Sequence, residues 1–460
     1  MWDTNDGVYV GYSTDVTEAA RPPPLGHERR YRDDRHILTI GPNGSGKSRR
    51  VLLPNLAELT GWSVVVVDPK GELAKMTLKH RKDAGNDIVV LDPFGVSGFE
   101  SHGYNPIAAL DPGTVDDPSD DFVDDCFALA EAMIRVEGKE PHWSASAQDL
   151  VCACIMAERL ARGTGGNLGG VRQVLGLPRK KFKVSMIAMQ WLSELFNCPE
   201  LSVKAARFEN KGRENDSIQS TALTQTRWLD SPRIKDDLNP KTDKPLFDFA
   251  QLKMKPTTVY LILPARRIAT HNVWMRLIIA SILQPLMKDT AKAEVPVMLM
   301  LDEYPALAEG DGFPAVSRNM AMFRGYGIKL WTVWQDLSQA ARIYGREGWE
   351  SFVANSGVLQ SFAPQDVFTA EYLSKRMPLS ERTSHSMNRS FKEGEAKDAG
   401  MSYSMDMAVE GMPLLLPQHL RDMDLGFSIV FSHAIKGVGR RYFPWEKKGL
   451  EHIYALDPAR

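Results

Sequence analysis

The sequence predicts an α/β fold built around a mainly parallel, doubly wound sheet, into which an all-helical segment is inserted. Residues 63–67 (SVVVV) and 297–301 (VMLML) are strand-length apolar runs without polar alternation, which is typical of parallel strands covered on both faces. Such runs alternate with helix-length stretches, as they do in doubly wound folds. Residues 119–228 differ, because they contain several helical patterns and almost no β-branched runs.

The first predicted strand, at residues 36–40, leads into GPNGSGKS at 41–48, which fits the phosphate-loop pattern G-x-x-x-x-G-K-[S/T]. A helix-length stretch follows, so backbone N–H groups and a helix N-terminus would converge on one anion. We expect Lys47 to reach the β- and γ-phosphates of a nucleotide, and the Ser48 hydroxyl to complete a Mg²⁺ shell. The alternative is a glycine-rich turn that binds nothing. The predicted nucleotide-binding residues are Gly41, Asn43, Gly44, Ser45, Gly46, Lys47 and Ser48.

Beyond the loop, strands and helices continue to alternate. Pro54 interrupts the helix-length stretch and predicts a kink or a restart. The strand at 63–67 ends in the charged sequence DPKGE at 68–72, at the end of the strand where ligands bind in open α/β sheets. The remaining elements predicted before residue 200 are a strand at 87–91, helices at 120–135, 144–161 and 184–196, and a loop at 163–170.

Strand patterns return after the helical stretch. The Ser-, Met-, Lys- and Glu-rich residues 380–412 are predicted to form a flexible excursion. Further strands are predicted at residues 258–263, 297–301, 328–333, 358–362 and 428–431. The predicted division is an extended lead-in at 1–35, a discontinuous α/β domain at 36–108 and 230–460, and an all-α domain at 109–229.

Asp302 and Glu303 directly follow the apolar run at 297–301. An acidic pair at the tip of a strand beside a phosphate loop predicts the second half of a nucleotide site. We expect Asp302 to hold Mg²⁺ through water and Glu303 to polarise the attacking water. The alternative is a strand-end turn with solvated carboxylates.

Gln335 follows the predicted strand at 328–333, which we expect beside the strand that ends at Asp302. A neutral amide there can sense the γ-phosphate or the attacking water without competing for the metal. Arg324 precedes the same strand, so we expect it at the opposite end from Gln335. That position suits an arginine that acts on a neighbouring subunit's site, and it suits a plain surface arginine nearly as well.

Composition excludes several other classes of protein. With 43% hydrophobic and 25% charged residues the chain is ordinary for a globular protein, and a formal net charge of −2 argues against a uniformly basic nucleic-acid-binding coat. Four cysteines are too few for a disulfide scaffold, and we expect buried thiols in a reducing cytosol. No apolar run reaches the roughly 18 residues of a membrane span and no secretory signal is present, which predicts a soluble, cytoplasmic protein. Metalloprotease and serine-hydrolase motifs are absent.

Several motifs in a fixed order resemble the coupling ATPases of type IV secretion and bacterial conjugation (the TraG/TraD type). The phosphate loop is shared by many NTPases, whereas DPKGE and QDLSQ are far more specific. The resemblance rests on GPNGSGKS (41–48), VVDPKGEL (66–73), LDP (91–93), YNP (104–106), LDEYPAL (301–307), RGYG (324–327), WQDLSQ (334–339), YG (344–345), PLL (413–415) and RYF (441–443).

The resemblance implies a RecA-like P-loop domain interrupted by an all-helical domain, with ATP and Mg²⁺ at the interfaces of a hexameric ring. It makes Arg324 the expected arginine across the interface. The implied partners are DNA, relaxase or effector proteins, and type IV secretion channel components, at the cytoplasmic face of the inner membrane. By resemblance, the residues with nucleotide roles are Lys47, Ser48, Asp302, Glu303 and Gln335.

Members of this family usually carry membrane helices before the phosphate loop, and here only a short polar segment precedes it. We therefore expect either a shortened form or a branch without membrane helices, whose hexamer forms with the help of DNA or a partner.

The leading functional hypothesis is an ATP-driven motor that moves DNA, or a relaxase–DNA complex, toward a secretion channel. The basic clusters at 179–183 and 266–267 could line a DNA channel, although a basic run is more often a solvated face. The second hypothesis is a nucleotide-gated receptor that hydrolyses little ATP and docks protein substrates on the helical insertion. The third is a chromosome-pumping translocase of the FtsK type, for which the DNA-orienting C-terminal domain is missing after residue 442.

Overall fold

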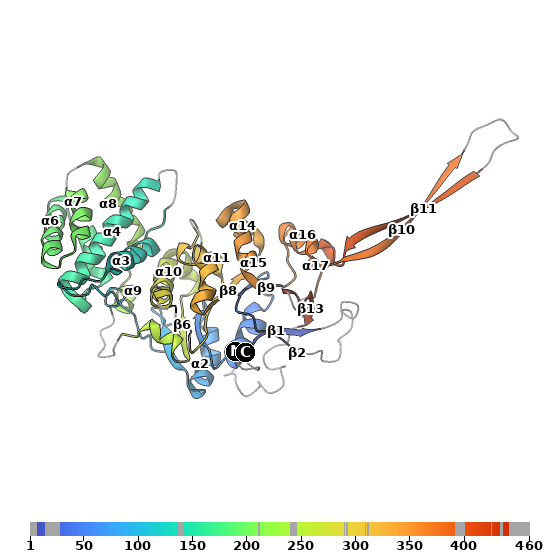
Figure 1. Ribbon diagram of the computed structural model, residues 1–460, viewed down its shortest axis with the longest axis horizontal. Helices are drawn as coiled ribbons and strands as arrows, with labels where there is room; N and C mark the ends of the chain where they lie inside the picture. The colour runs from blue at the N-terminus through green and yellow to red at the C-terminus, as the bar shows by residue number, and fades with distance from the viewer. Residues whose placement is uncertain are drawn as a thin grey trace.

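The computed structural model describes residues 7–13, 28–136, 141–209, 212–239, 246–288, 290, 293–308, 310, 312–391, 401–424, 426–432 and 436–440. The molecule is elongated, with a cluster of helices at one end, a large sheet in the middle and a long β-hairpin at the other end (Figure 1).

The central sheet contains eleven strands in the order β2-β1-β13-β12-β9-β3-β8-β7-β4-β6-β5. The strands from β9 to β5 in this order are all parallel to one another, whereas β12, β13, β1 and β2 extend the β9 edge in antiparallel fashion. Their bounds are β1 (Val8–Ser13), β2 (Glu28–Tyr31), β3 (His36–Ile40), β4 (Ser63–Val67), β5 (Asp87–Leu91), β6 (Thr257–Leu261), β7 (Val297–Leu301), β8 (Ile328–Trp334), β9 (Ser356–Ser361), β12 (Phe427–Ser432) and β13 (Lys436–Arg440).

The parallel core confirms the predicted α/β class, because its strands are covered on both faces. In β4, Val65 and Val67 pack into one hydrophobic cluster, whereas Val64 and Val66 pack into another on the opposite face. This two-sided burial explains the absence of polar alternation in the sequence. The helices that accompany the sheet are α1 (Leu53–Glu58), α2 (Glu72–Asp83), α10 (Ala265–Lys288), α11 (Tyr304–Ala308), α12 (Pro314–Ser317), α13 (Met320–Phe323), α14 (Leu337–Gly348), α15 (Glu350–Ala354), α16 (Val367–Lys375) and α17 (Pro417–Arg421).

Part of the predicted lead-in belongs to the sheet, which corrects the expectation for residues 1–35. Strand β1 pairs with β13 and β2, and Val8 and Val10 are buried. The buried Asn55 side chain of α1 accepts from the Tyr9 backbone N–H (2.7 Å) and donates to the Tyr9 carbonyl (2.9 Å). The N-terminal strand is therefore held against the helix that follows the phosphate loop.

The structure also corrects the flexible excursion predicted over residues 380–412. Strands β10 (Leu379–Phe391) and β11 (Met401–Pro413) form a continuous antiparallel ladder and project away from the sheet (Figure 1). The physical reason is visible in residues 401–409 (MSYSMDMAV), where apolar and polar residues alternate at strand period over most of the segment. The Ser- and Met-rich composition obscured that pattern.

Between β5 and β6 the described residues form helices, turns and one isolated bridge. The predicted helices at 120–135, 144–161 and 184–196 are present. The loop predicted at 163–170 is shorter than expected, because a helix begins at Leu168 with the Asn167 side chain as its N-cap. The helices at 199–209 and 232–237 and the first turn of the helix that begins at Arg179 were not predicted. All four cysteines of the chain are buried and unpaired with one another, in keeping with the predicted thiols. The helices here are α3 (Phe122–Met133), α4 (Pro141–Arg162), α5 (Leu168–Leu175), α6 (Arg179–Leu195), α7 (Pro199–Glu209), α8 (Arg213–Gln225) and α9 (Pro232–Asp237).

Among the residues described, no helix combines the length and apolarity that crossing a membrane requires.

The fully buried Arg81 joins α1, α2 and the sheet, and its replacement is expected to destabilise the fold. Its guanidinium donates to the carbonyls of Leu56 (2.7 Å), Leu59 (3.1 Å) and Trp62 (2.7 Å), to Asn86 Oδ1 (2.7 Å) and to the Thr258 hydroxyl. We expect Arg81→Met to lower the free energy of unfolding by roughly 3–5 kcal/mol, because buried carbonyls lose their donors.

Chemical denaturation measures this loss. The matched control is Lys82→Met, on the exposed side of the same helix turn, for which a change below about 0.5 kcal/mol is expected. Equal effects of the two substitutions would contradict a structural role for Arg81.

Candidate active site

The phosphate loop lies between β3 and a single π-helical turn at Ser48–Leu52, which continues into α1. Gly44 and Gly46 have φ of 78° and 79°, in the left-handed region that favours glycine. At Gly41 a Cβ atom would come within 2.8 Å of Ser45 Oγ and 2.9 Å of the Phe362 side chain. The loop conformation therefore requires glycine at these positions.

Lys47 is mostly buried at the start of the helix. Its Nζ donates to the carbonyls of Gly41 (2.5 Å) and Pro42 (3.2 Å). Burial lowers the pKa of Lys47, and the nearby carboxylates of Asp302 and Glu303 oppose that shift. The amine is thus held against two carbonyls of the loop, close enough to the acidic pair to be stabilised by its charge.

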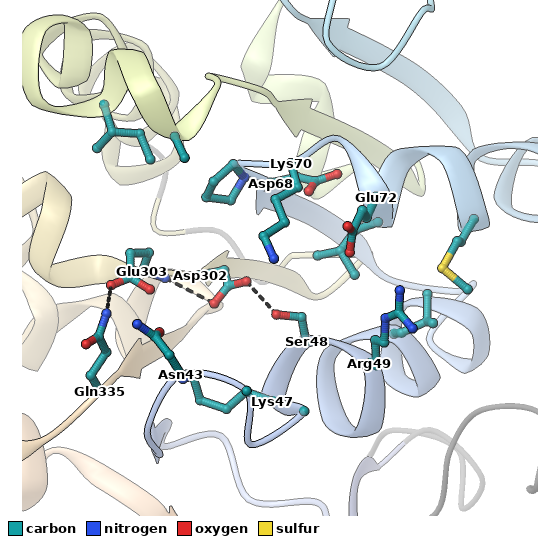
Figure 2. Close-up of a pocket in the computed structure, with 18 residues that line it drawn as sticks. Asn43, Lys47, Ser48, Arg49, Asp68, Lys70, Glu72, Asp302, Glu303 and Gln335 are labelled. Carbon is teal, nitrogen blue, oxygen red and sulfur yellow. Dashed lines mark hydrogen bonds between the residues drawn. The ribbon is translucent and has the colours of Figure 1, made fainter. Parts of the chain in front are cut away.

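Ser48 and Asp302 make the contact that joins the two halves of the site (Figure 2). Asp302 follows β7, two strands from β3, and its Oδ2 accepts from the Ser48 hydroxyl at 2.8 Å. Burial raises the pKa of Asp302, whereas the Ser48 hydrogen bond and Lys47 lower it. A hydroxyl and a carboxylate this close fit a Mg²⁺ ion that would take its other ligands from phosphates and water. Among the described residues, no group of three or more His, Cys, Asp or Glu side chains could hold a metal by itself.

Glu303 and Gln335 lie at the tips of neighbouring parallel strands, β7 and β8. Gln335 Nε2 donates to Glu303 Oε1 at 2.6 Å, and the contact is visible in Figure 2. Glu303 has φ of 57°, a left-handed conformation that is unfavourable for a residue other than glycine and is found more often at functional sites. The turn after β7 therefore holds this carboxylate in a defined place.

These residues line a cavity of about 450 Å³ above the sheet edge. Residues from the DPKGE motif form its other wall, and Lys70 points into the cavity toward Ser48 and Asp302 (Figure 2). Burial raises the pKa of Asp68 to about 7, and its Oδ2 accepts from the Ala74 N–H at 2.9 Å.

Sequence reasoning assigned no site role to several residues of this wall. The charged sequence that ends the strand at 63–67 was the available signal for Asp68, Lys70 and Glu72, whereas no motif marked Arg49. Of the predicted loop residues, Gly41 and Ser45 do not line the cavity, whereas the other five do. The lining residues without a predicted role include Arg49, Asp68, Lys70 and Glu72.

Arg324 does not belong to this cavity. It lies before β8, at the opposite end of that strand from Gln335, and its Nε donates to Asp34 Oδ2 at 2.6 Å. Its side chain is 58% exposed. This is the placement expected from the sequence, and it leaves the guanidinium accessible to a neighbouring molecule.

Beside Arg324, Lys329 provides a pH-dependent contribution to stability. Its Nζ lies 4.9 Å from the Tyr31 ring centroid and 5.3 Å from that of Trp62, and burial lowers its pKa from 10.5 to about 8. The unfolded chain therefore binds more protons between pH 8 and 10.5, so this lysine makes stability rise with pH in that window.

We expect Lys329→Met to remove this rise, which amounts to roughly 3 kcal/mol at most. Denaturation midpoints measured from pH 7.5 to 10 for both proteins test this prediction, with Lys255→Met at the exposed Lys255 as control. Parallel pH profiles for the wild type and Lys329→Met would contradict it.

Comparisons with known proteins agree with this geometry. A model of the family described as "Type IV secretory system Conjugative DNA transfer" matches residues 8–448. The chain is 27% identical to protein VirD4 of Rhizobium radiobacter over 413 residues, covering 87% of this chain and 55% of that protein. It is 27% identical to the conjugal transfer protein TraG of Escherichia coli over 394 residues, covering 81% and 58%. The chain thus spans a little over half the length of these relatives.

Solved structures show the same fold. The unbound bacterial conjugative coupling protein TrwBdeltaN70 superposes with a TM-score of 0.63 at 14% identity, covering 88% of this chain and 83% of that one. TrwB in complex with ADP and Mg²⁺ gives a TM-score of 0.60 at 15% identity, covering 88% and 84%. These matches confirm the predicted RecA-like α/β fold.

Proposed function

The chain belongs to the family of type IV secretory system conjugative DNA-transfer proteins, and from that premise we propose that it is an ATPase that couples recruitment of DNA, or of a relaxase–DNA complex, to a type IV secretion channel. The observation that carries the proposal is the 2.8 Å contact between Ser48 and Asp302. It unites the phosphate loop with the acidic pair in one cavity, as nucleotide hydrolysis requires.

In this proposal each half of the cavity has its own task. Backbone N–H groups of the loop and the Lys47 amine bind the phosphates. Ser48 and Asp302 hold Mg²⁺, which when bound neutralises charge on the β- and γ-phosphates. Glu303 orients and polarises the attacking water, and Gln335 holds the Glu303 carboxylate in place. The ADP and Mg²⁺ bound by TrwB support this choice of ligands.

The family supports the rest of the proposal. We place the working protein in the cytoplasm, at the inner membrane when it engages the secretion channel, as a homo-hexamer with ATP at its subunit interfaces. DNA and relaxase or effector proteins are its proposed substrates. Arg324 is the arginine proposed to reach the neighbouring subunit's site.

DNA-dependent turnover tests the motor directly. We expect ATP turnover to rise when DNA is added, and the stimulation to fall as salt increases, because phosphate contacts release counterions. The variant Lys47→Ala lacks the cation at the phosphates, so its ATP turnover serves as the background rate. Turnover that is equal with and without DNA at every salt concentration would contradict the motor and leave the nucleotide-gated receptor as the better account.

A further inference from the structure

Helix α6 carries two apolar stripes rather than one. The inner stripe packs into the helical domain and consists of the buried Phe182, Met186 and Met189, followed by the buried polar residue Ser193. A surface helix normally presents polar residues on its opposite side. In α6 that side carries Val184, Ala188, Trp191 and Leu195, all exposed.

The outer stripe is open to solvent to an unusual degree. Val184 is 65% exposed, Trp191 72% and Leu195 65%. Large aromatic side chains are among the residues that most strongly anchor protein interfaces. Because α6 lies at the end of the molecule far from the sheet, nothing in the described fold covers this stripe (Figure 1).

The spacing of the stripe indicates what kind of element covers it. Val184, Ala188, Trp191 and Leu195 are separated by four, three and four residues. This is the spacing by which two helices pack side by side at a shallow angle. A flat nucleic-acid backbone places no such demand on the register of apolar residues. The exposed Glu194, three residues after Trp191, is unfavourable at an anionic lipid surface.

Two lysines continue the stripe at its N-terminal end and indicate the charge of the partner. Lys180 and Lys181 are exposed and lie four and three residues before Val184. Within the described part of the chain neither has an ion-pair partner, whereas Arg179 and Lys183 pair with Asp216 and Glu209. The first turn of α6 holds no acidic residue, so the helix dipole and the lysines add to the same positive potential.

The size of the stripe favours a short segment over a second folded copy of the chain. A buried tryptophan contributes about 200 Å² of buried surface. Trp191 and the three smaller residues of the stripe together therefore provide less than the roughly 800 Å² that each partner of a stable dimer buries. A single docked helix matches this area.

We propose that the outer face of α6, defined by Lys180, Lys181, Val184, Ala188, Trp191 and Leu195, is the docking surface for an acidic amphipathic helix of a protein partner. The partner helix presents apolar residues at three- and four-residue spacing to Trp191 and its neighbours. Its carboxylates face Lys180 and Lys181. The surface is separate from the nucleotide cavity, so it adds to the proposed function a defined site for protein recruitment.

A pair of designed peptides tests the proposal on the full chain. One labelled helical peptide of about 20 residues carries leucines at three- and four-residue spacing and glutamates at one end, and its twin carries lysines instead. By fluorescence anisotropy we expect the wild type to bind the acidic peptide about tenfold or more tightly than the basic one. Trp191→Ser is expected to weaken that binding about tenfold or more.

Charge reversal provides the sharper arm of the test. The double substitution Lys180→Glu, Lys181→Glu is expected to invert the preference between the two peptides. Met254→Ser, which changes an equally exposed apolar residue (65%) outside the helical domain, is expected to change neither affinity. Thermal melting and ATP turnover of each variant should match the wild type, which separates failure of this surface from failure of the nucleotide site.

Four outcomes would overturn the proposal. If the acidic peptide still binds Trp191→Ser, the apolar stripe is not the contact. If the double lysine variant still prefers the acidic peptide, Lys180 and Lys181 do not contact the peptide. Binding of a DNA oligonucleotide that is lost in the double variant but kept in Trp191→Ser identifies a nucleic-acid face instead. A wild-type dimer in sedimentation that Trp191→Ser dissociates identifies a contact between copies of this chain.

Discussion

Replacing Glu303 with glutamine is expected to lower ATP turnover by about 10²–10⁴-fold while leaving nucleotide binding intact. The substitution preserves shape and accepts the same left-handed backbone, but the amide no longer attracts a proton from water. Lys47, Ser48 and Asp302 remain in place to bind the nucleotide. Steady-state hydrolysis and titration with a fluorescent ATP analogue measure the two effects separately.

The matched control for this prediction is Glu294→Gln, the same change at an exposed position before the other end of β7. It should leave turnover within about twofold, because a surface charge change of this kind has little energetic consequence. If Glu303→Gln keeps more than a tenth of the wild-type turnover, Glu303 is not the residue that activates water. Loss of ATP-analogue binding would instead show that Glu303 contributes to nucleotide binding.

Arg324→Ala is expected to lower the turnover of the assembled protein by about 10³-fold or more, because an arginine that reaches a neighbouring active site stabilises transition-state charge. The decisive measurement is a mixture of two inactive variants, Arg324→Ala and Glu303→Gln. In a mixed ring, a subunit with intact Glu303 can sit beside a subunit with intact Arg324, so one interface in each such pair is complete. We expect the mixture to recover turnover that neither variant shows alone.

The comparison variant here is Arg318→Ala, which removes another exposed arginine that is engaged in an ion pair, to Glu131. Its turnover should remain near that of the wild type. Two results argue against Arg324 acting across subunits. One is full activity of Arg324→Ala in the assembled state, and the other is a mixture that stays as inactive as its components.

The candidate site could be anticipated from the sequence because its parts are short, local and placed at strand ends. The parallel strands that precede Ser48, Asp302 and Gln335 are recognisable as uninterrupted apolar runs. Carboxyl ends of such strands share one edge of the sheet, so residues that follow them meet. The contacts from Ser48 to Asp302 and from Gln335 to Glu303 have this origin.

The parts that could not be anticipated depend on long-range partners. Strand β1 is no shorter than the strands that were predicted, and its pairing with β13 and β2 and its anchorage by Asn55 define it. The motif at Asp68, Lys70 and Glu72 marked a strand end where ligands bind, but which of its side chains enter the nucleotide cavity depends on the turn after β4. The outer stripe of α6 was hidden by the inner one, since both have helical spacing.

The β10–β11 hairpin makes the kinetics of amide hydrogen exchange uneven across the molecule. The two strands form a sheet of their own, so in each strand the backbone groups that face outward have no ladder partner. An isolated two-stranded ribbon is marginally stable in water, and it opens without disturbing the core. Deuterium should therefore enter residues 379–391 and 401–413 within the earliest time points, whereas the amides of β3, β7 and β8 exchange only when the whole sheet unfolds. A partner that adds a third strand to the hairpin would be detected first as slower exchange in these two segments.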